Sequence, residues 1–307
     1  MSDISKYIQL IKSGEAVAFP TETVYGLGAD AWNPSAIQKV FEVKGRPSDN
    51  PLIVHISKKE DVQDFALQIP ETAEKLMEAF WPGPLSLVLR KKQEVLDAVT
   101  AGLDTVAIRM PDHPKALDFI SRTGPLVAPS ANTSGRPSPT KAEHVREDFG
   151  PDFPVIDGEA TKIGLESTVI DLSGDLPSIL RPGSISRKQI EKVLETKVQE
   201  SFFHHAEKPR SPGQKYSHYK PKAEVRWLTN SDDLKDASSL FLMLNSQTEA
   251  PNIINYKGNL DQFAKELYDR FRQADIEDFD FVVIEPFETV EHSIVSALFN
   301  RVTKAID

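Results

Sequence analysis

A chain of 307 residues is long enough to bury one large hydrophobic core or two smaller ones, and the usual size of domains favours two. Its composition of 39% hydrophobic and 27% charged residues is typical of a soluble globular protein, and no apolar run reaches the roughly 18 residues that a membrane-spanning helix needs. The net charge of −10 argues against a protein that coats nucleic acid, and the absence of cysteine excludes disulfides, thiolate nucleophiles and Cys-ligated metals.

The N-terminal residues alternate charged and apolar side chains, MSDISKYIQLIKSGEAV, as an amphipathic helix does. They lack the continuous apolar stretch of an export signal. Together with the absence of cysteine, this leads us to expect a cytoplasmic protein that does not bind a membrane.

Helix-like and strand-like periodicities then alternate to about residue 195, which predicts an α/β domain. The predicted helices cover residues 4–13, 34–45, 70–80, 114–123 and 185–195. The predicted strands cover residues 16–21, 52–56, 85–89, 105–110, 126–131, 154–158, 167–172 and 177–183.

A basic segment separates this domain from a smaller one. Residues 200–222 show neither periodicity, and the segment 196–222 has a net charge of +4 between regions of −6 and −8. We expect a linker or an ordered loop there. The smaller domain, residues 223–307, is also predicted to be α/β, with strands at 224–228, 240–244 and 279–286, a helix start at 230–233, and helices at 260–274 and 292–305.

Two polar segments follow predicted elements and fit a phosphate site. FEVKGRPSDNPL puts Lys44 and Arg46 at a helix end, and VAPSANTSGRPSPT puts Ser130 and Asn132 after a strand, where open α/β sheets bind phosphates. Each segment also has an ordinary explanation, because cations favour helix C-termini and Ser and Asn favour turns. The residues alone therefore leave both interpretations open.

The segment GLGADA nominally matches a dinucleotide fingerprint, which we reject. A true fingerprint opens a helix directly after its strand, whereas here Pro20 interrupts the approach and Trp-Asn-Pro follows the second glycine. No Walker, His-Glu-x-x-His or Gly-x-Ser-x-Gly sequence occurs either. The common nucleotide and hydrolase templates therefore do not apply.

Three further polar residues lie in or at the end of apolar strands. Arg109, in TVAIRMP, needs an anionic partner, either an internal carboxylate or that of a substrate, and the internal pair is the default in a chain with 46 acidic residues. His55, in LIVHI, is by default a hydrogen-bonded core histidine. Arg181, in ILRPGS, is another cation at a strand end.

Seven ordered motifs together resemble the YrdC-like threonylcarbamoyl-AMP synthase family: PTETVYGLG, KGRPSDNPL, WPGPLSLVL, TVAIRMP, SANTSGRPSPT, ESTVIDL and LRPG. The likeness covers about residues 5–195, and SPGQKYSHYKP with the tail resembles the long, two-domain form. It implies a YrdC-like twisted mixed sheet with helices and a smaller, Rossmann-like α/β domain. The expected parts are a catalytic domain (1–195), a linker or lid (196–222) and a C-terminal domain (223–307).

The resemblance implies a nucleotidyltransferase that converts L-threonine, bicarbonate and ATP to threonylcarbamoyl-AMP and pyrophosphate. The product would supply the threonylcarbamoyl modification of tRNA adenosine, so a tRNA-modifying transferase complex is the expected downstream partner, without strong nucleic-acid binding by this chain. Magnesium is expected on the ATP phosphates, and no protein ligand for a metal is assigned.

The resemblance also implies site residues. The central polar site comprises Lys44, Arg46, Ser130 and Asn132. The threonine pocket comprises Thr23, His55, Arg109, Ser130 and Ser167, with Arg109 on the carboxylate in place of the default internal pair. The ATP contacts comprise Arg46, Asn50, Thr105, Asn132, Thr140, Arg181 and an aromatic of the linker, Tyr219 before Tyr216.

The basic linker leads to a hypothesis of its own. We expect it to fold over ATP as a lid that excludes water, with Lys215, Tyr216, His218 or Tyr219 against the triphosphate. The alternative is a spacer, and deletion of residues 211–221 would then leave activity nearly unchanged.

Three other functions compete with the synthase. A YrdC-like module that binds RNA without catalysis is disfavoured by the acidic balance. A carbamoyl-transfer maturation factor would need zinc fingers, which a chain without cysteine cannot supply. An ATP-binding regulatory protein stays open.

Overall fold

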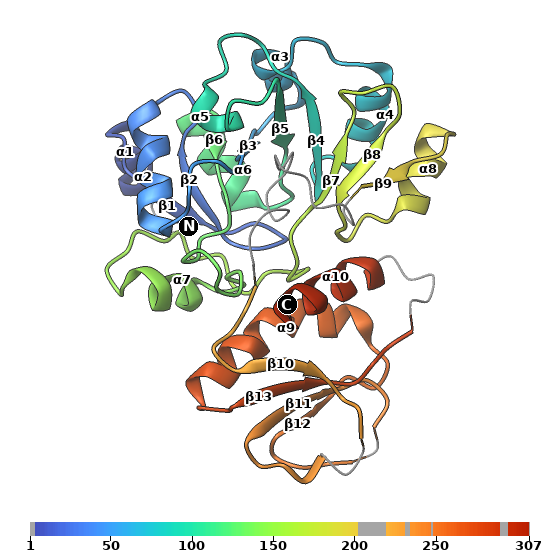
Figure 1. Cartoon of the computed structure of the whole chain (residues 1–307). Helices are drawn as coiled ribbons and strands as arrows, with labels where there is room; N and C mark the ends of the chain where they lie inside the picture. Colours follow the sequence, from blue (N-terminus) through green and yellow to red (C-terminus); the bar gives the residue numbers. More distant parts are fainter. Residues whose placement is uncertain (1–3, 202–218, 231–233, 247, 289–293, 307) are drawn as a thin grey trace.

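The chain folds into two α/β domains, each built on its own sheet (Figure 1). The structure is a computed structural model that describes residues 4–201, 219–230, 234–246, 248–288 and 294–306. The larger domain is uppermost in Figure 1 and the smaller one lies below it. This agrees with the predicted fold class.

The larger sheet has nine strands in the order β1-β2-β6-β3-β5-β4-β7-β8-β9. It is mixed, because β3 pairs with β5 in parallel and β4 pairs with β5 antiparallel. The strands are β1 (Val17–Phe19), β2 (Gly26–Asp30), β3 (Ile53–His55), β4 (Leu85–Arg90), β5 (Thr105–Arg109), β6 (Leu126–Val127), β7 (Thr168–Asp171), β8 (Ser178–Arg181) and β9 (Gln199–Glu200).

Helices accompany this sheet in chain order: α1 (Ser5–Lys12), α2 (Pro34–Lys44), the 3₁₀ helix η1 (Lys59–Asp61), α3 (Val62–Phe65), α4 (Glu71–Phe80), α5 (Asp97–Thr100), α6 (Pro114–Thr123), α7 (Ala142–Phe149) and α8 (Arg187–Leu194). The main core contains buried residues of α2, α4 and α8 together with one face of the central strands. On the other face, α1 and α6 pack with Phe19 of β1 and Leu126 of β6.

The bounds of α2 follow from local chemistry. The side chain of Asn33 caps its first turn by accepting from the backbone amides of Ser35 and Ala36, and Pro34 occupies its first position. The helix ends at Gly45, whose φ of +59° is a left-handed conformation that glycine adopts readily. The chain therefore turns sharply between Lys44 and Arg46.

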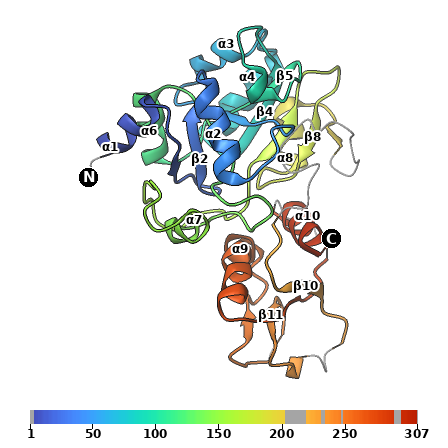
Figure 2. The same cartoon turned by 60° about the vertical axis from the view of Figure 1, so that its left-hand side comes forward.

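The smaller domain has a wholly parallel sheet in the order β10-β13-β11-β12. Its elements are β10 (Glu224–Trp227), β11 (Ser239–Met243), β12 (Ile253–Asn255), α9 (Leu260–Ile276), β13 (Phe281–Ile284) and α10 (Val295–Ile306). In Figure 1 α9 and α10 lie between this sheet and the larger domain, and in Figure 2 α9 runs beside the sheet while α10 lies next to the larger domain. Val24, Leu165 and Tyr219 belong to the same hydrophobic cluster as the core of the smaller domain.

Several elements differ from the sequence prediction. Residues 154–158 form no strand, because only Val155 bridges to Ala18 and the segment is bounded by Pro154 and Gly158. The strands β2 and β12 and the helix α7 were not predicted, and β9 extends the first sheet beyond the expected boundary at residue 195. The helix start expected at 230–233 falls largely outside the described residues.

Within the described residues, no helix is both long and apolar enough to cross a membrane.

Candidate functional site

One cavity brings together most of the predicted site residues. It is lined by Thr23, Arg46, His55, Arg109, Ser130, Ser167, Arg181 and Tyr219, and also by Thr21, Val24, Gly26, Ile53, Ala128, Pro129 and Glu166. These residues come from eight separate segments of the chain, including the end of the linker. The fold thus collects residues that are far apart in the sequence.

The alternation of side chains along the strands explains this arrangement. Val54 and Ile108 point into the main core, so Ile53, His55 and Arg109 point to the opposite face of the sheet. On this face the central strands carry a small apolar cluster of Ile53, Val88, Ala107, Val169 and Leu180. Because β3 and β5 are parallel neighbours, His55 and Arg109 lie side by side in register at their ends.

Arg109 is buried and has three protein partners. Its Nε donates to the carbonyl of Gly83 at 3.2 Å, and its Nη1 donates to the hydroxyl of Thr23 at 2.8 Å. Its Nη2 lies 2.7 Å from Oε1 of Glu22, an ion pair whose angle is not that of a hydrogen bond. The internal carboxylate partner expected from the composition is therefore present, and Arg109 also lines the cavity.

His55 is a neutral imidazole. Burial, followed by the charge of Arg109, lowers its pKa from the usual 6.5 to about 3. Its Nδ1 lies 3.2 Å from the carbonyl of Ile53, which can only accept, so Nδ1 carries the proton. Nε2 then keeps its lone pair and can accept a hydrogen bond.

Ser167 and Arg181 form a second polar pair in the cavity. Arg181 donates from Nε to the carbonyl of Ser167 and from Nη2 to its hydroxyl, both at 3.0 Å. The hydroxyl of Ser86 lies 2.8 Å from that of Ser167. Gly183 makes this arrangement possible, because a Cβ there would lie 2.2 Å from the backbone nitrogen of Thr168.

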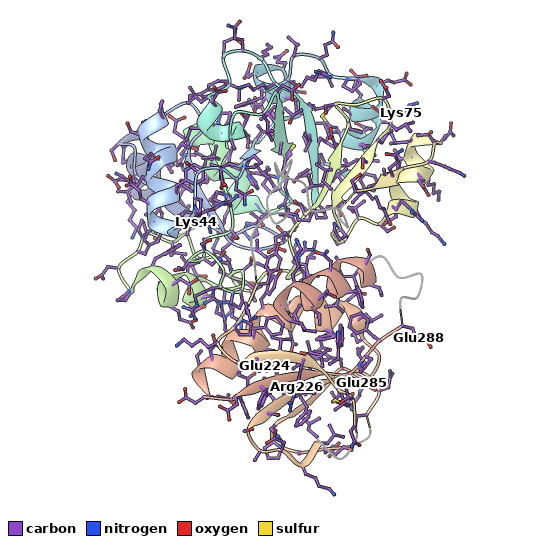
Figure 3. The ribbon with its side chains drawn as sticks, in the orientation of Figure 1. Lys44, Lys75, Glu224, Arg226, Glu285 and Glu288 are labelled. Carbon is purple, nitrogen blue, oxygen red and sulfur yellow. The ribbon has the colours of Figure 1, made fainter. Side chains whose placement is uncertain are left out.

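Lys44 does not line the cavity, although sequence analysis predicted it in the central site. Its Nζ donates to the carbonyls of Ser130 and Asn132, both at 2.6 Å. Lys44 lies inside the ribbon of the larger domain in Figure 3, in contrast to Lys75 at the outer edge. Burial and the nearby Arg46 lower the pKa of the Lys44 ammonium well below its usual value. Lys44 thus holds the loop that carries Ser130.

Four other predicted residues also lie outside the cavity lining: Asn50, Thr105, Asn132 and Thr140. Thr105 begins β5 and lies on the same face of the sheet as Arg109, but at the other end of the strand. The Thr140 hydroxyl lies 3.4 Å from Nδ1 of His144. Among the described residues, the amide atoms of Asn50 and the Oδ1 of Asn132 are buried without a hydrogen-bond partner, which is uncommon in a protein interior.

Sequence analysis missed Glu166, a cavity residue that is bound by the smaller domain. Its carboxylate accepts from Nε of Arg301 at 2.8 Å, from the hydroxyl of Ser138 at 2.6 Å and from that of Tyr268 at 3.1 Å. Burial alone would raise its pKa, but Arg301 and Arg181 hold the pKa at about 2. The sequence could have identified Glu166, because it is the first residue of the ESTVIDL motif.

Tyr219 comes from the predicted lid and is buried in the cavity wall. Its ring stacks on Tyr268 with 5.4 Å between ring centres. Its φ of +75° is unusual for a tyrosine and is a strained backbone conformation. The other residues predicted for the lid, Lys215, Tyr216 and His218, lie outside the described residues.

Within the described part of the chain, no group of three or more His, Asp or Glu side chains is arranged to hold a metal ion. The cavity wall instead carries the guanidinium groups of Arg46, Arg109 and Arg181. The site therefore suits anions better than a resident metal.

Comparison with protein families accounts for both domains. A family model described as "Telomere recombination" (Sua5_yciO_yrdC) matches residues 9–183. A second model, described as "Threonylcarbamoyl-AMP synthase, C-terminal domain", matches residues 185–306.

Individual relatives match nearly the whole chain. The threonylcarbamoyl-AMP synthase of Bacillus subtilis is 43% identical over 98% of this chain and 92% of its own length, and that of Pyrococcus abyssi is 43% identical over 96% and 91%. The crystal structure of P. abyssi Sua5 complexed with L-threonine has a TM-score of 0.91 at 40% identity and covers 99% of this chain and 94% of that one. The chain therefore belongs to the threonylcarbamoyl-AMP synthase family, in its two-domain form, and is an enzyme of the nucleotidyltransferase type.

Proposed function

We propose that the cavity binds L-threonine beside ATP and converts them, with bicarbonate, to threonylcarbamoyl-AMP and pyrophosphate. The observation that carries the proposal is the gathering of Arg46, Arg109 and Arg181 around one cavity on an otherwise apolar sheet face. The amino-acid carboxylate, the carbamate and the triphosphate are all anions, and permanently charged guanidinium groups stabilise such species. The related P. abyssi Sua5, 40% identical, has been crystallised in complex with L-threonine.

The chemistry needs positioned cations more than a nucleophilic side chain. Bicarbonate takes up a proton and loses water to give carbon dioxide. The neutral amine of threonine forms a bond to the carbon of carbon dioxide and gives up one proton, and the resulting carbamate oxygen attacks the α-phosphorus of ATP. The bond from that phosphorus to the bridging oxygen breaks, and pyrophosphate leaves with its electron pair. Holding the two reactants together in a polar, preorganised site accounts for most of the expected rate enhancement.

The threonine subsite comprises Thr23, His55, Arg109, Ser130 and Ser167 in this proposal. Arg109 binds the carboxylate, because its pair with Glu22 is not a full hydrogen bond and its guanidinium lines the cavity. Nε2 of His55 accepts a hydrogen bond from the threonine hydroxyl, which an amino acid without a hydroxyl cannot donate. A buried acceptor left unpaired by such an analogue would give selectivity for threonine.

The ATP subsite comprises Arg46, Asn50, Thr105, Asn132, Thr140, Arg181 and Tyr219. The unpartnered amide atoms of Asn50 and the unpartnered Oδ1 of Asn132 support this assignment, because buried polar atoms usually have a partner and a ligand would supply it. Arg181 and Arg46 bind phosphate oxygens. Magnesium arrives as part of the Mg-ATP substrate and is held through the phosphates, where it keeps most of its waters.

Lys44 acts in this proposal as a positioning residue rather than as a group that touches substrate. Its two short hydrogen bonds to the loop carbonyls fix Ser130 and Asn132 with respect to the end of α2. Arg46 follows that end directly, so the two halves of the polar site are linked through one ammonium group.

The product of this reaction is a reactive mixed anhydride, which a tRNA-modifying transferase complex would consume. We propose that the enzyme works in the cytoplasm, where tRNA and ATP are available to it. The proposed parts of the chain are a catalytic domain to about residue 195, a linker and lid over 196–222, and the domain of residues 223–307.

Pyrophosphate release tests the proposal. The protein is incubated with Mg-ATP, bicarbonate and threonine, valine or alanine in turn. Release that requires both threonine and bicarbonate supports the synthase. Release without threonine contradicts it, and RNA binding without any ATP turnover would favour the noncatalytic module.

A further inference from the structure

Arg301 of α10 is a fully buried cation that reaches from the smaller domain to the cavity wall. Its Nε donates to the carboxylate of Glu166 at 2.8 Å, and its Nη2 donates to the carbonyl of Pro182 at 3.1 Å. Glu166 precedes Ser167, and Pro182 follows Arg181. Arg301 therefore holds the chain neighbour of each member of the Ser167–Arg181 pair.

Glu166 lies between two cations of different function. It is bound to Arg301. Burial lowers the pKa of Arg181, and the negative charge of Glu166 opposes this by favouring the charged guanidinium. Arg181 donates to Ser167 and forms no ion pair among the described residues. A buried carboxylate is strongly stabilised by a cation, so Glu166 would turn to Arg181 if Arg301 were absent.

Other residues of the smaller domain hold Glu166 in the same orientation. The Tyr268 hydroxyl donates to its carboxylate. Arg301, which binds that carboxylate, is itself packed with its guanidinium carbon 5.2 Å from the ring centre of Tyr219. Gly164 packs so closely against α9 that a Cβ there would lie 2.4 Å from the Cα of Lys265. The segment before Glu166 is thereby fastened to α9.

We propose that Arg301 is a positioning residue for the ATP subsite: by occupying the Glu166 carboxylate, it keeps Arg181 available to bind a phosphate oxygen of ATP. This inference rests on the proposed assignment of Arg181 to ATP. It gives the smaller domain a defined part in nucleotide binding, although none of its described residues lines the cavity.

The test compares four variants of the full chain with the wild type: Arg301→Gln, Arg301→Lys, the double variant Glu166→Gln with Arg301→Gln, and Arg270→Gln as the matched control. Arg270 is a partly buried arginine on α9 of the same domain, and its ion pair with Glu266 stays within that helix. The measurements are the dissociation constant of ATP by calorimetry, the KM of threonine from pyrophosphate release, and the melting temperature.

We expect Arg301→Gln to weaken ATP binding about 10-fold or more, the effect of losing one charge-assisted phosphate contact, while the KM of threonine changes less than about 3-fold. The double variant removes the competing carboxylate, so ATP binding should return to within about 3-fold of the wild type. Arg301→Lys keeps the charge and should retain most of the affinity, and Arg270→Gln should bind ATP as the wild type does.

Equal ATP affinity in Arg301→Gln and Arg270→Gln would overturn the inference, as would a double variant no better than the single one, because a merely structural arginine predicts no rescue. If Arg301→Gln does not fold, the double variant still decides: it has no carboxylate that could compete for Arg181, so an ATP affinity far below that of the wild type would overturn the inference. The variant Arg181→Gln separates the two proposals. Unchanged ATP binding in Arg181→Gln would overturn both the assignment of Arg181 to ATP and the inference. Weakened ATP binding in Arg181→Gln together with unchanged ATP binding in Arg301→Gln would overturn the inference alone.

Discussion

At the scale of single residues, Arg109 combines a structural and a ligand-binding environment. Its contacts with Gly83 and Thr23 fix the guanidinium, and Glu22 balances its charge inside the protein. A substrate carboxylate would add a charge-assisted hydrogen bond to a cation that is already oriented. This preorganisation is what an amino-acid site on a rigid strand requires.

Arg109→Ala is expected to raise the KM of threonine by roughly 10- to 100-fold, the equivalent of one charge-assisted pair, and to change the KM of ATP far less. Glu22 loses its partner, so the melting temperature should fall as well. Steady-state kinetics with each substrate varied in turn measure the split. Arg90→Ala, an exposed arginine on β4, is the control. Equal changes in the two KM values would contradict the carboxylate role.

The buried His55 predicts how stability depends on pH. The native pKa of about 3 lies below the usual 6.5, so the unfolded chain takes up this proton first as the pH falls. The contribution of neutral His55 is complete above pH 6.5 and is lost progressively between pH 6.5 and about pH 3. Urea unfolding at pH 7 and pH 5 should show a smaller loss for His55→Gln than for the wild type. The same loss in both proteins would show that His55 does not titrate in this way.

At the scale of elements, close packing of the segment after β8 holds Arg181 in the cavity. Gly183→Ala would force a Cβ to within 2.2 Å of the backbone of Thr168, which must displace Arg181 from Ser167. We expect the variant to lose roughly 1–3 kcal/mol of stability and to bind ATP more weakly. Gly174→Ala is the matched control, since nothing lies within 4 Å of its added Cβ. Unaltered ATP binding in Gly183→Ala would disprove the packing argument.

The elements also show what could be predicted from the sequence. Apolar runs such as LIVHI and TVAIRM identified β3 and β5, and the cap and glycine around α2 identified that helix. The strand β2 reads GLGAD, whose two glycines do not favour a strand, β12 has only three residues, and α7 carries mostly polar side chains. The partner of Arg109 and the contact between Glu166 and Arg301, 135 residues apart, depend on tertiary packing that no local pattern encodes.

At the scale of the whole molecule, buried ion pairs join the two domains. Arg272 of α9 is buried and donates to both carboxylate oxygens of Asp148, at 2.9 and 3.0 Å, and to the carbonyl of Pro137 at 2.6 Å. Val24 and Leu165 of the larger domain complete the core of the smaller one. The domains are therefore expected to unfold together.

Arg272→Ala should lower the free energy of unfolding by roughly 3 kcal/mol, because it leaves Asp148 buried with one cation fewer. Calorimetry of the wild type should show a single unfolding transition, and the variant should melt earlier or in two steps. Two well-separated transitions in the wild type would refute the coupling of the domains.

In the proposed reaction the cavity joins threonine, carbon dioxide and the adenylate of ATP in one product. Incubation with Mg-ATP, threonine and isotopically labelled bicarbonate, followed by mass spectrometry, measures this directly. We expect threonylcarbamoyl-AMP that carries the label in its carbamoyl carbon, and no labelled adenylate when threonine is replaced by valine. Release of pyrophosphate with unlabelled AMP as the only nucleotide product would contradict it.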